Sequence, residues 1–279
     1  MKPDPAHSRW LATGAVGFSL GMSGPSHSRL GDAGDRRGGA FYDDSELFEH
    51  YQQHRAWSLN PNTVMEGPAL FDELGPVSGL RVLDLGCGDA EIGRELLNAG
   101  AERYRGIDGS TRMIQAAQLI LKDTTGEAVL CDIEDLAEPV VSFDLVLSRM
   151  ALHYVADLGG VLRACRACLA PGGRLLFTVV HPVITSHDAR ENSTEPRQNW
   201  VVDDYFNTGP RDQQWLGSRT VWHHRTIEDY VAELRNAGFA LTNLRECAPR
   251  REQFDDDAEF ERRRRIPLVL LLAGARVSS

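Results

Sequence analysis

Residues 82–93 limit the folds open to this chain more than any other part of its sequence. They read VLDLGCGDAEIG, in which a short apolar run leads into Gly86 and Gly88 and a helical pattern follows. Glycines at a strand-to-helix turn let the backbone approach a ligand without a side chain in the way. The segment therefore predicts an α/β sheet whose first strand ends at a ligand-binding turn.

The rest of the chain alternates strand and helix patterns. Apolar runs predict seven strands, at 81–85, 103–107, 127–131, 143–148, 173–180, 239–247 and 267–275. Amphipathic patterns predict helices at 90–99, 110–122 and 157–169. Strands that alternate with such helices form βαβ units with right-handed crossovers. We predict one doubly wound α/β domain with a mostly parallel seven-stranded sheet.

Three segments fall outside this alternation. Residues 1–39 are rich in Gly, Ser and Pro and predict a disordered leader, after which the domain spans 40–279. It begins with a helical cover at 40–78, with helices predicted at 43–57 and 62–74. Residues 182–225 show no clear period, and we interpret them as a substrate cap inserted after the fifth strand, because loops at the carboxyl ends of strands form the ligand crevice. Thr226 then predicts the N-cap of a helix, although Asp229 stands where a capping box prefers Glu or Gln.

The glycine turn suits one of two cofactor classes. A dinucleotide needs G-x-G-x-x-G, and Glu91 occupies the position of the third glycine, where a carboxylate would repel a pyrophosphate. S-adenosyl-L-methionine has no phosphate and carries a cationic amine and sulfonium, which Asp84 would suit. The sequence therefore favours S-adenosylmethionine as cofactor, with a nicotinamide-dependent oxidoreductase as the alternative.

Four fragments in order resemble class I, Rossmann-like S-adenosylmethionine-dependent methyltransferases, over about residues 45–275. Residues 84–90 resemble the first motif, an acid followed by x-G-x-G-x-G, with Ala90 in place of the third glycine. The others are GIDGS at 106–110, LCDI at 130–133 and PGGRL at 171–175, a turn expected before the fifth strand. Alone, each has a structural alternative: Asp108 could cap the next helix, and Asp132 could be a turn residue.

The resemblance implies a set of cofactor-binding residues. In the family, an acid at the position of Asp108 accepts the ribose hydroxyls, a methionine like Met113 packs near the adenine, and an acid like Asp132 takes the adenine amino group. An aromatic and an arginine in a helical cover close over the cofactor, although Arg55 could also be an exposed helix residue. The expected set is Asp84, Gly86, Gly88, Asp108, Gly109, Met113, Asp132, Ile133, Ser148, Tyr51 and Arg55.

The fourth strand predicts the branch of the family. Residues 148–151 read SRMA, so the Asp/Asn-Pro-Pro-aromatic motif of amino-methylating nucleic-acid enzymes is absent, and Ser148 is no metal ligand. We expect no metal and no nucleic-acid partner, since 40 acidic against 30 basic side chains give a net charge of −10, although a local basic patch stays open.

The three tryptophans of the cap favour a bulky apolar or aromatic small molecule, methylated at O, N or C. They could equally form the cap's core or a subunit contact, and a role in natural-product biosynthesis is a hypothesis.

A general base is needed only where the methyl acceptor keeps its proton near neutral pH. His181, just beyond the fifth strand, is the preferred candidate and His153 the second, with His223 and His224 behind them. Each could instead bond the backbone, and an electron-rich carbon acceptor would need no base. A cofactor-binding subunit without catalysis is the non-enzyme alternative.

The remaining features predict a cytoplasmic protein without membrane spans. Five scattered cysteines do not form a disulfide framework, and the pair Cys165 and Cys168 lacks the second pair of a zinc site. No apolar run reaches the roughly 18 residues of a transmembrane helix. Four arginines at 262–265 follow three aspartates at 255–257 and predict a self-neutralised surface loop. The sequence leaves a monomer and a homo-oligomer both open.

Overall fold

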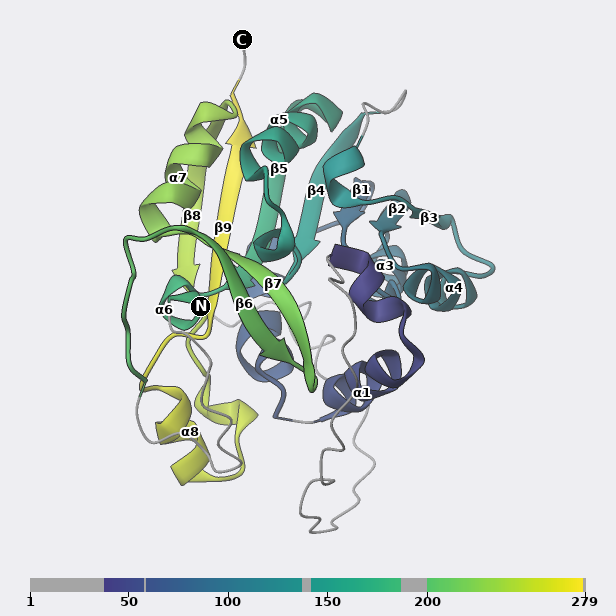
Figure 1. Ribbon diagram of the computed structural model, residues 1–279. Helices are drawn as coiled ribbons and strands as arrows, with labels where there is room; N and C mark the ends of the chain where they lie inside the picture. The colour runs from purple at the N-terminus through teal and green to yellow at the C-terminus, as the bar shows by residue number, and fades with distance from the viewer. Residues whose placement is uncertain (1–37, 58, 137–141, 187–199, 278–279) are drawn as a thin grey trace, which may run out of the picture. The chain divides into compact units, whose positions relative to one another are not determined.

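A seven-stranded sheet in the order β3-β2-β1-β4-β5-β9-β8 forms the centre of the fold (Figure 1). The computed structural model describes residues 38–57, 59–136, 142–186 and 200–277, so nearly all of the predicted leader lies outside the described residues. Five neighbouring strands pair with one another in parallel, and these are β1 (Arg81–Leu85), β2 (Arg103–Asp108), β3 (Gly126–Leu130), β4 (Phe143–Arg149) and β5 (Leu169–Val180). β9 (Val269–Arg276) runs antiparallel to both β5 and β8 (Phe239–Glu246). The doubly wound, mostly parallel sheet is confirmed.

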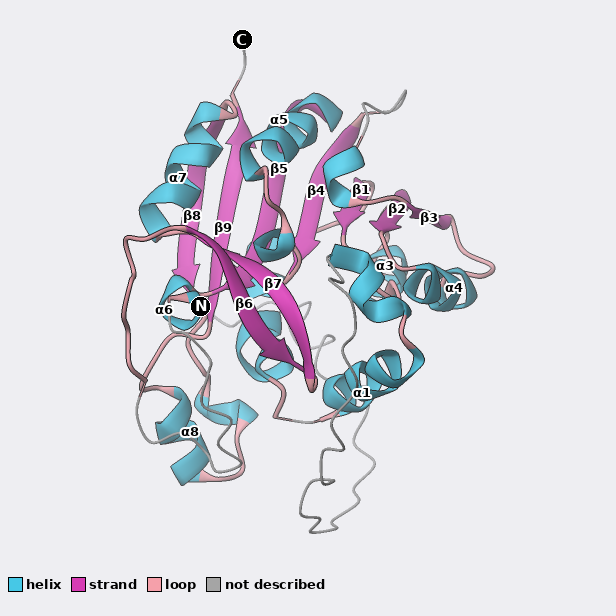
Figure 2. Ribbon diagram, in the orientation of Figure 1, coloured by secondary structure: helices cyan, strands magenta, loops and turns pink. Residues whose placement is uncertain are grey.

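Helices cover both faces of this sheet (Figure 2). One core layer joins the strands to α2 (Gly67–Leu74), α3 (Glu91–Asn98) and α4 (Thr111–Ile120). The other joins them to α5 (Leu158–Cys168) and α7 (Ile227–Asn236). Strands covered on both faces need apolar side chains at nearly every position, which is why the sequence of β9 is an almost unbroken apolar run.

Side-chain caps set where the helices begin. Ser110 accepts the Met113 N–H at the start of α4, and Asp157 accepts the Gly160 N–H at the start of α5. Thr226 and Asp229 form both arms of a capping box on α7, so aspartate serves here in place of the usual Glu or Gln. These local bonds account for where the predicted helices begin.

The helical cover differs from its prediction in detail. It contains a 3-10 segment, η2 (Gly38–Asp43), then α1 (Ser45–Ala56), a π-helical turn, η3 (Asn62–Glu66), and α2. The helix expected over 62–74 is therefore π-helical in its first part. Pro68 has no N–H to bond the carbonyl four residues before it, which interrupts the α-helical ladder there.

The predicted turn at 171–175 lies inside a strand. β5 already begins at Leu169, which pairs with Phe143, and pairing resumes between Leu145 and Arg174. The extra residues between these pairs form a bulge in which Gly172 has a φ of 78°. The glycines are thus needed for an irregularity within β5 rather than for a turn before it.

The cap, 182–225, contains a short helix and a β-hairpin that the sequence pattern did not reveal. After α6 (Pro182–Thr185), β6 (Gly209–Trp215) and β7 (Ser218–His224) pair around Leu216 and Gly217, which have φ values of 51° and 83°. Positive φ at both positions matches a two-residue type I′ turn. The hairpin contacts α6 and the 3-10 turn η5 (Leu152–Tyr154), so it lies over the carboxyl ends of β4 and β5, with its tip toward α1 (Figure 1).

The first two residues of the predicted arginine-rich loop, Arg262 and Arg263, belong to a helix, α8 (Asp257–Arg263), and Arg264 and Arg265 form the turn after it. Asp256 caps this helix, and Glu259 pairs with Arg262 and Arg263 three and four residues along the same helix face. The expectation of a loop neutralised by the preceding aspartates is wrong, because glutamates within the helix neutralise most of the charge.

Within the described ranges, no helix has both the length and the apolar character to span a bilayer, and no cluster of side chains could hold a metal ion.

A buried ion pair fastens the cover to the sheet. The fully buried Glu66 accepts from Arg149 Nε at 3.0 Å and from Thr178 Oγ1 at 3.0 Å. Glu66→Gln should lower the free energy of unfolding by about 3 kcal/mol, because the largely buried Arg149 guanidinium would lose its negatively charged partner. Denaturant unfolding measures this, with Asp212→Asn as the control, since Asp212 and Arg219 form an exposed pair. A Glu66→Gln protein as stable as its parent would contradict the role given to this pair.

Candidate active site

The glycine turn presents bare backbone at the carboxyl end of β1. Gly86 and Gly88 have φ values of 70° and 56°. A Cβ on Gly86 would lie 2.5 Å from the Ala151 Cβ and 3.3 Å from Ile133 Cδ1, so the ends of β1, β3 and β4 meet closely here. Ala90 also adopts a positive φ, 59°, which a side chain rarely does. The turn lies where the strand order reverses between β1 and β4, the place at which open α/β sheets bind ligands.

Asp84 is a buried carboxylate with one oxygen left without a partner. Tyr104 Oη donates to Oδ2 at 2.6 Å, whereas Oδ1 has no hydrogen-bond partner among the described residues. Burial raises the pKa of Asp84 to about 6, against the opposing effect of the Tyr104 hydroxyl. Gly93 makes room for this contact, because a Cβ there would collide with the Tyr104 ring. A buried carboxylate of this kind fits a ligand that brings a positive charge and a donor.

Asp108 joins the end of β2 to the glycine turn. Its Oδ2 accepts from the Gly88 N–H at 3.0 Å and its Oδ1 from the Ser110 N–H at 2.9 Å. Burial raises its pKa, and these two backbone donors lower it. The N-cap of α4 is Ser110, so the capping alternative for Asp108 is wrong. Each oxygen of Asp108 keeps a second lone pair, which a pair of ligand hydroxyls could occupy.

Segment η2 lies across the end of β2. A Cβ on Gly109 would collide with Asp132 Oδ1 and lie 3.3 Å from Gly39 Cα, so three chain segments meet there. Asp43 holds η2 in place, since its Oδ1 accepts from Ser110 Oγ at 2.8 Å. Nearby, Met113 Sδ lies 4.0 Å from where a Cβ of Gly88 would stand. The structure thus brings together eight of the predicted cofactor residues, which are Asp84, Gly86, Gly88, Asp108, Gly109, Met113, Asp132 and Ile133.

Arg55 reaches the same turn from α1. Its guanidinium donates to Asp89 Oδ1 at 3.2 Å and to Glu91 Oε2 at 2.7 Å, and it lies 5.9 Å from the centre of the Tyr51 ring. Arg55 is therefore not simply an exposed helix residue, because it links the cover to the glycine turn. Ser148, in contrast, donates its hydroxyl proton to the Leu85 carbonyl at 2.8 Å and ties β4 to β1.

The preferred histidine, His181, is held on both sides by the protein. Its Nδ1 accepts from the Val183 N–H at 3.1 Å, and its Nε2 lies 3.1 Å from Glu246 Oε1. Burial lowers its pKa and Glu246 raises it. His224 is held in the same way, between Thr185 Oγ1 and the Tyr205 carbonyl. The expectation that His181 faces a ligand is therefore corrected: it caps α6 and binds β8.

His153 differs, because its buried Nδ1 has no hydrogen-bond partner among the described residues. Burial, assisted by the positive charge of Arg225, lowers its pKa to about 3, so the ring is neutral at pH 7. It lies 4.4 Å from the Tyr154 ring and 5.3 Å from the Trp222 ring, measured between centroids. The second candidate thus faces the aromatic rings of the cap with an unpartnered ring nitrogen, whereas both ring nitrogens of His181 are held by the protein.

An aromatic cluster joins the cap to the cover, and the sequence did not predict that its members meet. We define it as Tyr42, Tyr51, His54, His153, Tyr154, Trp215 and Trp222. The Trp215 ring lies 5.0 Å from His54, and Tyr42 and Tyr154 share a hydrogen bond of 3.2 Å. Trp200 lies outside the cluster, with its indole N–H on the Val183 carbonyl at 2.9 Å. Tyr51, His153 and the cap's tryptophans were each singled out in the sequence, but nothing in the sequence placed them together or paired Tyr42 with Tyr154.

Comparison with known proteins places these features in a family. Residues 83–177 match the model of a methyltransferase domain. An S-adenosylmethionine-dependent methyltransferase of Mesorhizobium loti is 33% identical, superposes with a TM-score of 0.69, and is matched over 80% of this chain and 100% of its own. An uncharacterized protein of Haemophilus influenzae is 30% identical over 215 residues, 74% of this chain and 85% of its own.

Curated enzymes match a shorter part. A ubiquinone biosynthesis O-methyltransferase of Ralstonia nicotianae is 31% identical over 142 residues, 46% of this chain and 57% of its own. A tRNA U34 carboxymethyltransferase of Citrifermentans bemidjiense is 28% identical over 150 residues, 48% of this chain and 46% of its own. The chain spans about half the length of these two relatives. It belongs to the class I S-adenosylmethionine-dependent methyltransferases, and S-adenosylmethionine is its cofactor.

Proposed function

We propose that this enzyme methylates an O, N or C atom of a small aromatic or bulky apolar molecule held between the β6–β7 hairpin and the ends of β4 and β5. The observation that carries the proposal is the aromatic cluster, which lies beside the glycine turn. Tyr51 belongs to the cluster and also contacts Arg55, whose guanidinium bonds Asp89 of that turn. Aromatic side chains supply large apolar surface with a polar edge, which suits an aromatic ligand.

The cofactor contacts are proposed from the same geometry. Asp84 fits the cationic amine, because its unpartnered oxygen is buried beside the bare backbone of the turn. Asp108 fits the ribose hydroxyls, and Asp132, which lies against Gly109, fits the adenine. When bound, the cofactor supplies a methyl group already activated by the sulfonium charge.

Alignment is the main task left to the protein. Holding two reactants in line can lower a barrier by roughly 7–11 kcal/mol. A residue with a pKa of about 3 is a poor general base at neutral pH. We therefore assign His153 to orienting the acceptor through a hydrogen bond rather than to removing its proton.

A nucleic-acid substrate is the alternative raised by the tRNA-modifying relative. That relative is matched over 46% of its length, and the charge of this chain is −10, whereas phosphate contacts supply much of the affinity for nucleic acids. Isotope-labelled cofactor, offered with a metabolite extract and with total tRNA, separates the two. We expect a small-molecule product heavier by one methylene in mass spectrometry, and none with the Asp84→Asn enzyme. Label in tRNA alone would contradict the proposal.

Asp132→Ala should weaken cofactor binding with little effect on the fold. The Asp132 side chain makes no capping bond and is exposed, so few protein contacts depend on it. We expect a loss of about 0.5–1.5 kcal/mol in binding free energy, as for one hydrogen bond. Calorimetry measures the affinity and thermal unfolding controls for the fold. Unchanged affinity would place the adenine elsewhere.

A further inference from the structure

The inner face of the β6–β7 hairpin carries buried polar groups without partners. We define this face as Gln213, Trp215, Thr220 and Trp222. The Gln213 Nε2, the Thr220 Oγ1 and both indole Nε1 atoms are buried and make no hydrogen bond of good geometry among the described residues, although the Trp215 indole lies near the Tyr42 hydroxyl and the Trp222 indole near the Tyr154 hydroxyl. Gln213 and Thr220 are only 5% and 2% exposed. Each such group destabilises a fold, so a cluster of them calls for a function.

These groups lie side by side. Gln213 pairs directly with Thr220 across the hairpin, and Trp222 follows two residues later on the same face. The rings of Trp215 and Trp222 have centroids 6.3 Å apart. His153, with its own unpartnered Nδ1, faces Trp222 from η5. Four hydrogen-bond donors therefore lie on one side of the hairpin, next to aromatic rings.

The charges near this face are positive. Arg225 donates to the carbonyls of Val155 and Ala156, and Arg211 to those of Asp204 and Asn207. Neither arginine forms an ion pair within the described residues. Burial is the main cause of the lowered pKa values of His153 and His224, and the charge of Arg225 lowers the first further, as that of Arg211 does the second.

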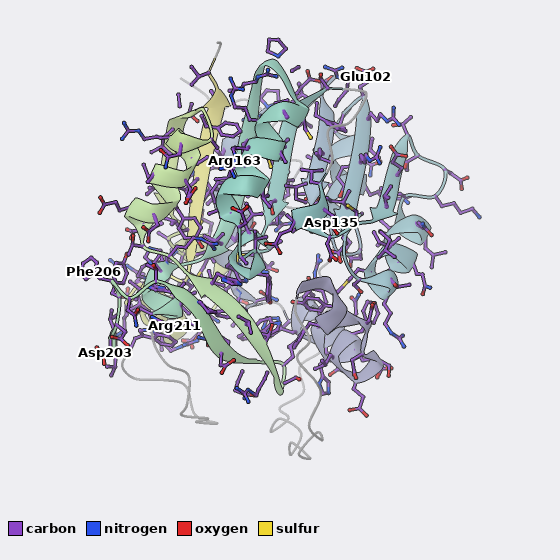
Figure 3. All side chains as sticks on the ribbon, turned by 45° about the horizontal axis from the view of Figure 1, so that its top comes forward. Glu102, Asp135, Arg163, Asp203, Phe206 and Arg211 are labelled. Atoms are coloured by element: carbon purple, nitrogen blue, oxygen red, sulfur yellow. The ribbon has the colours of Figure 1, made fainter. Side chains whose placement is uncertain are left out.

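The nearby carboxylates are occupied elsewhere. Asp229, which raises the pKa of His224, is held by the N–H and hydroxyl of Thr226. Asp212 pairs with Arg219, and both are largely exposed, at 68% and 71% of their side chains. In Figure 3, Asp203 and Phe206 of the preceding loop project outward from the fold. Of these carboxylates, Asp229 acts on the pKa of His224, but its effect is smaller than the opposite effect of Arg211.

We propose that the inner face of the hairpin binds the carboxylate of a planar aromatic acid, whose ring packs against Trp222 and Tyr154. The oxygens of a carboxylate offer about four acceptor sites, which two indole N–H groups, the amide of Gln213 and the hydroxyl of Thr220 can fill. The inference rests on the proposed function, because it names the class of methyl acceptor for the same site.

One substitution should have opposite effects on the stability of the free protein and on its affinity for a carboxylate. Thr220→Val keeps the shape of the side chain and removes a buried hydroxyl that the free protein leaves unpaired, so the melting temperature should rise. The same change removes a donor to the ligand, so carboxylate affinity should fall about three- to tenfold. A purely structural Thr220 would instead lose stability when changed. Gln213→Met is the second variant, with the same expected directions.

The test uses protein saturated with S-adenosylhomocysteine and follows tryptophan fluorescence. The probes are 2-naphthoate and 2-naphthylmethylammonium, which share a ring system and differ in charge. We expect 2-naphthoate to bind at least about tenfold more tightly, a difference typical of a charge-assisted hydrogen bond. Gln214→Ala, which changes an exposed residue of the same strand's outer face, should leave this affinity unchanged.

The outcomes separate the two proposals. Failure of S-adenosylhomocysteine to bind would count against the proposed function itself. Cofactor binding without a preference for the carboxylate probe, or without any binding of it, would overturn only the inference. The inference is also overturned if Thr220→Val and Gln213→Met leave carboxylate affinity unchanged.

Discussion

Asp108→Asn should weaken S-adenosylmethionine binding by roughly 1.5–3 kcal/mol, about ten- to a hundredfold. The carboxylate accepts one backbone N–H on each oxygen, from Gly88 and from Ser110. Asparagine presents a single carbonyl oxygen, and its NH2 group would then face one of these two donors. The glycine turn or the start of α4 therefore loses its anchor, and the ribose loses a charge-assisted acceptor.

Two measurements isolate this effect, the melting temperature without ligand and the affinity by calorimetry. Thr226→Ala is the control, because it removes the N-cap of another helix, α7, where the Thr226 Oγ1 accepts from the Asp229 N–H. That variant should lose about 1 kcal/mol of stability and keep most of its cofactor affinity. If Asp108→Asn binds the cofactor as tightly as the parent, the ribose does not meet this side chain.

The second large effect is the dependence of cofactor affinity on pH, which we expect to arise from Asp84. Burial raises the pKa of Asp84 in the free protein to about 6, and a cationic amine beside it would favour the ionised form. Cofactor affinity should therefore rise with pH up to about 6, by as much as about tenfold per pH unit, and level off above it. Binding below this pH should release close to one proton, which calorimetry in buffers of different ionisation enthalpy measures.

The same group affects the stability of the free protein in the opposite sense. Because the folded pKa of Asp84 lies above its unfolded value of 3.8, the fold holds the proton more tightly. Its contribution to stability is complete below about pH 4 and is lost as the pH rises through about 6, by at most about 3 kcal/mol. Asp84→Asn should flatten both profiles. Cofactor affinity that is independent of pH between about 5 and 7 would contradict the placement of the amine.

Local signals explain what the sequence predicted well. The apolar runs became strands because helices cover both sheet faces, and Ser110 and Thr226 begin helices through bonds to residues three positions away. The glycine turn was recognisable for the same reason, since Gly86 and Gly88 need positive φ. The acids at the strand ends followed from topology, because parallel strands end at one edge of the sheet.

Non-local pairing explains what the sequence could not show. The hairpin was missed because its inner face buries Gln213 and Thr220 rather than apolar residues, which hides the two-residue period. His181 was misjudged because its partner, Glu246, comes from a strand 65 residues later. The buried polar residues that break the strand pattern of the cap thus lie where we propose that the substrate binds.

The central claim is that the turn at Gly86 and Gly88, with Asp84 beneath it, binds a cationic sulfonium cofactor rather than a dinucleotide. Calorimetric titration of the same protein with S-adenosylmethionine, S-adenosylhomocysteine and NAD tests this most directly. The account predicts that both adenosyl sulfur compounds bind and NAD does not, because Glu91 stands where a dinucleotide fold needs glycine. Tight binding of NAD, with no response to either sulfur compound, would contradict it.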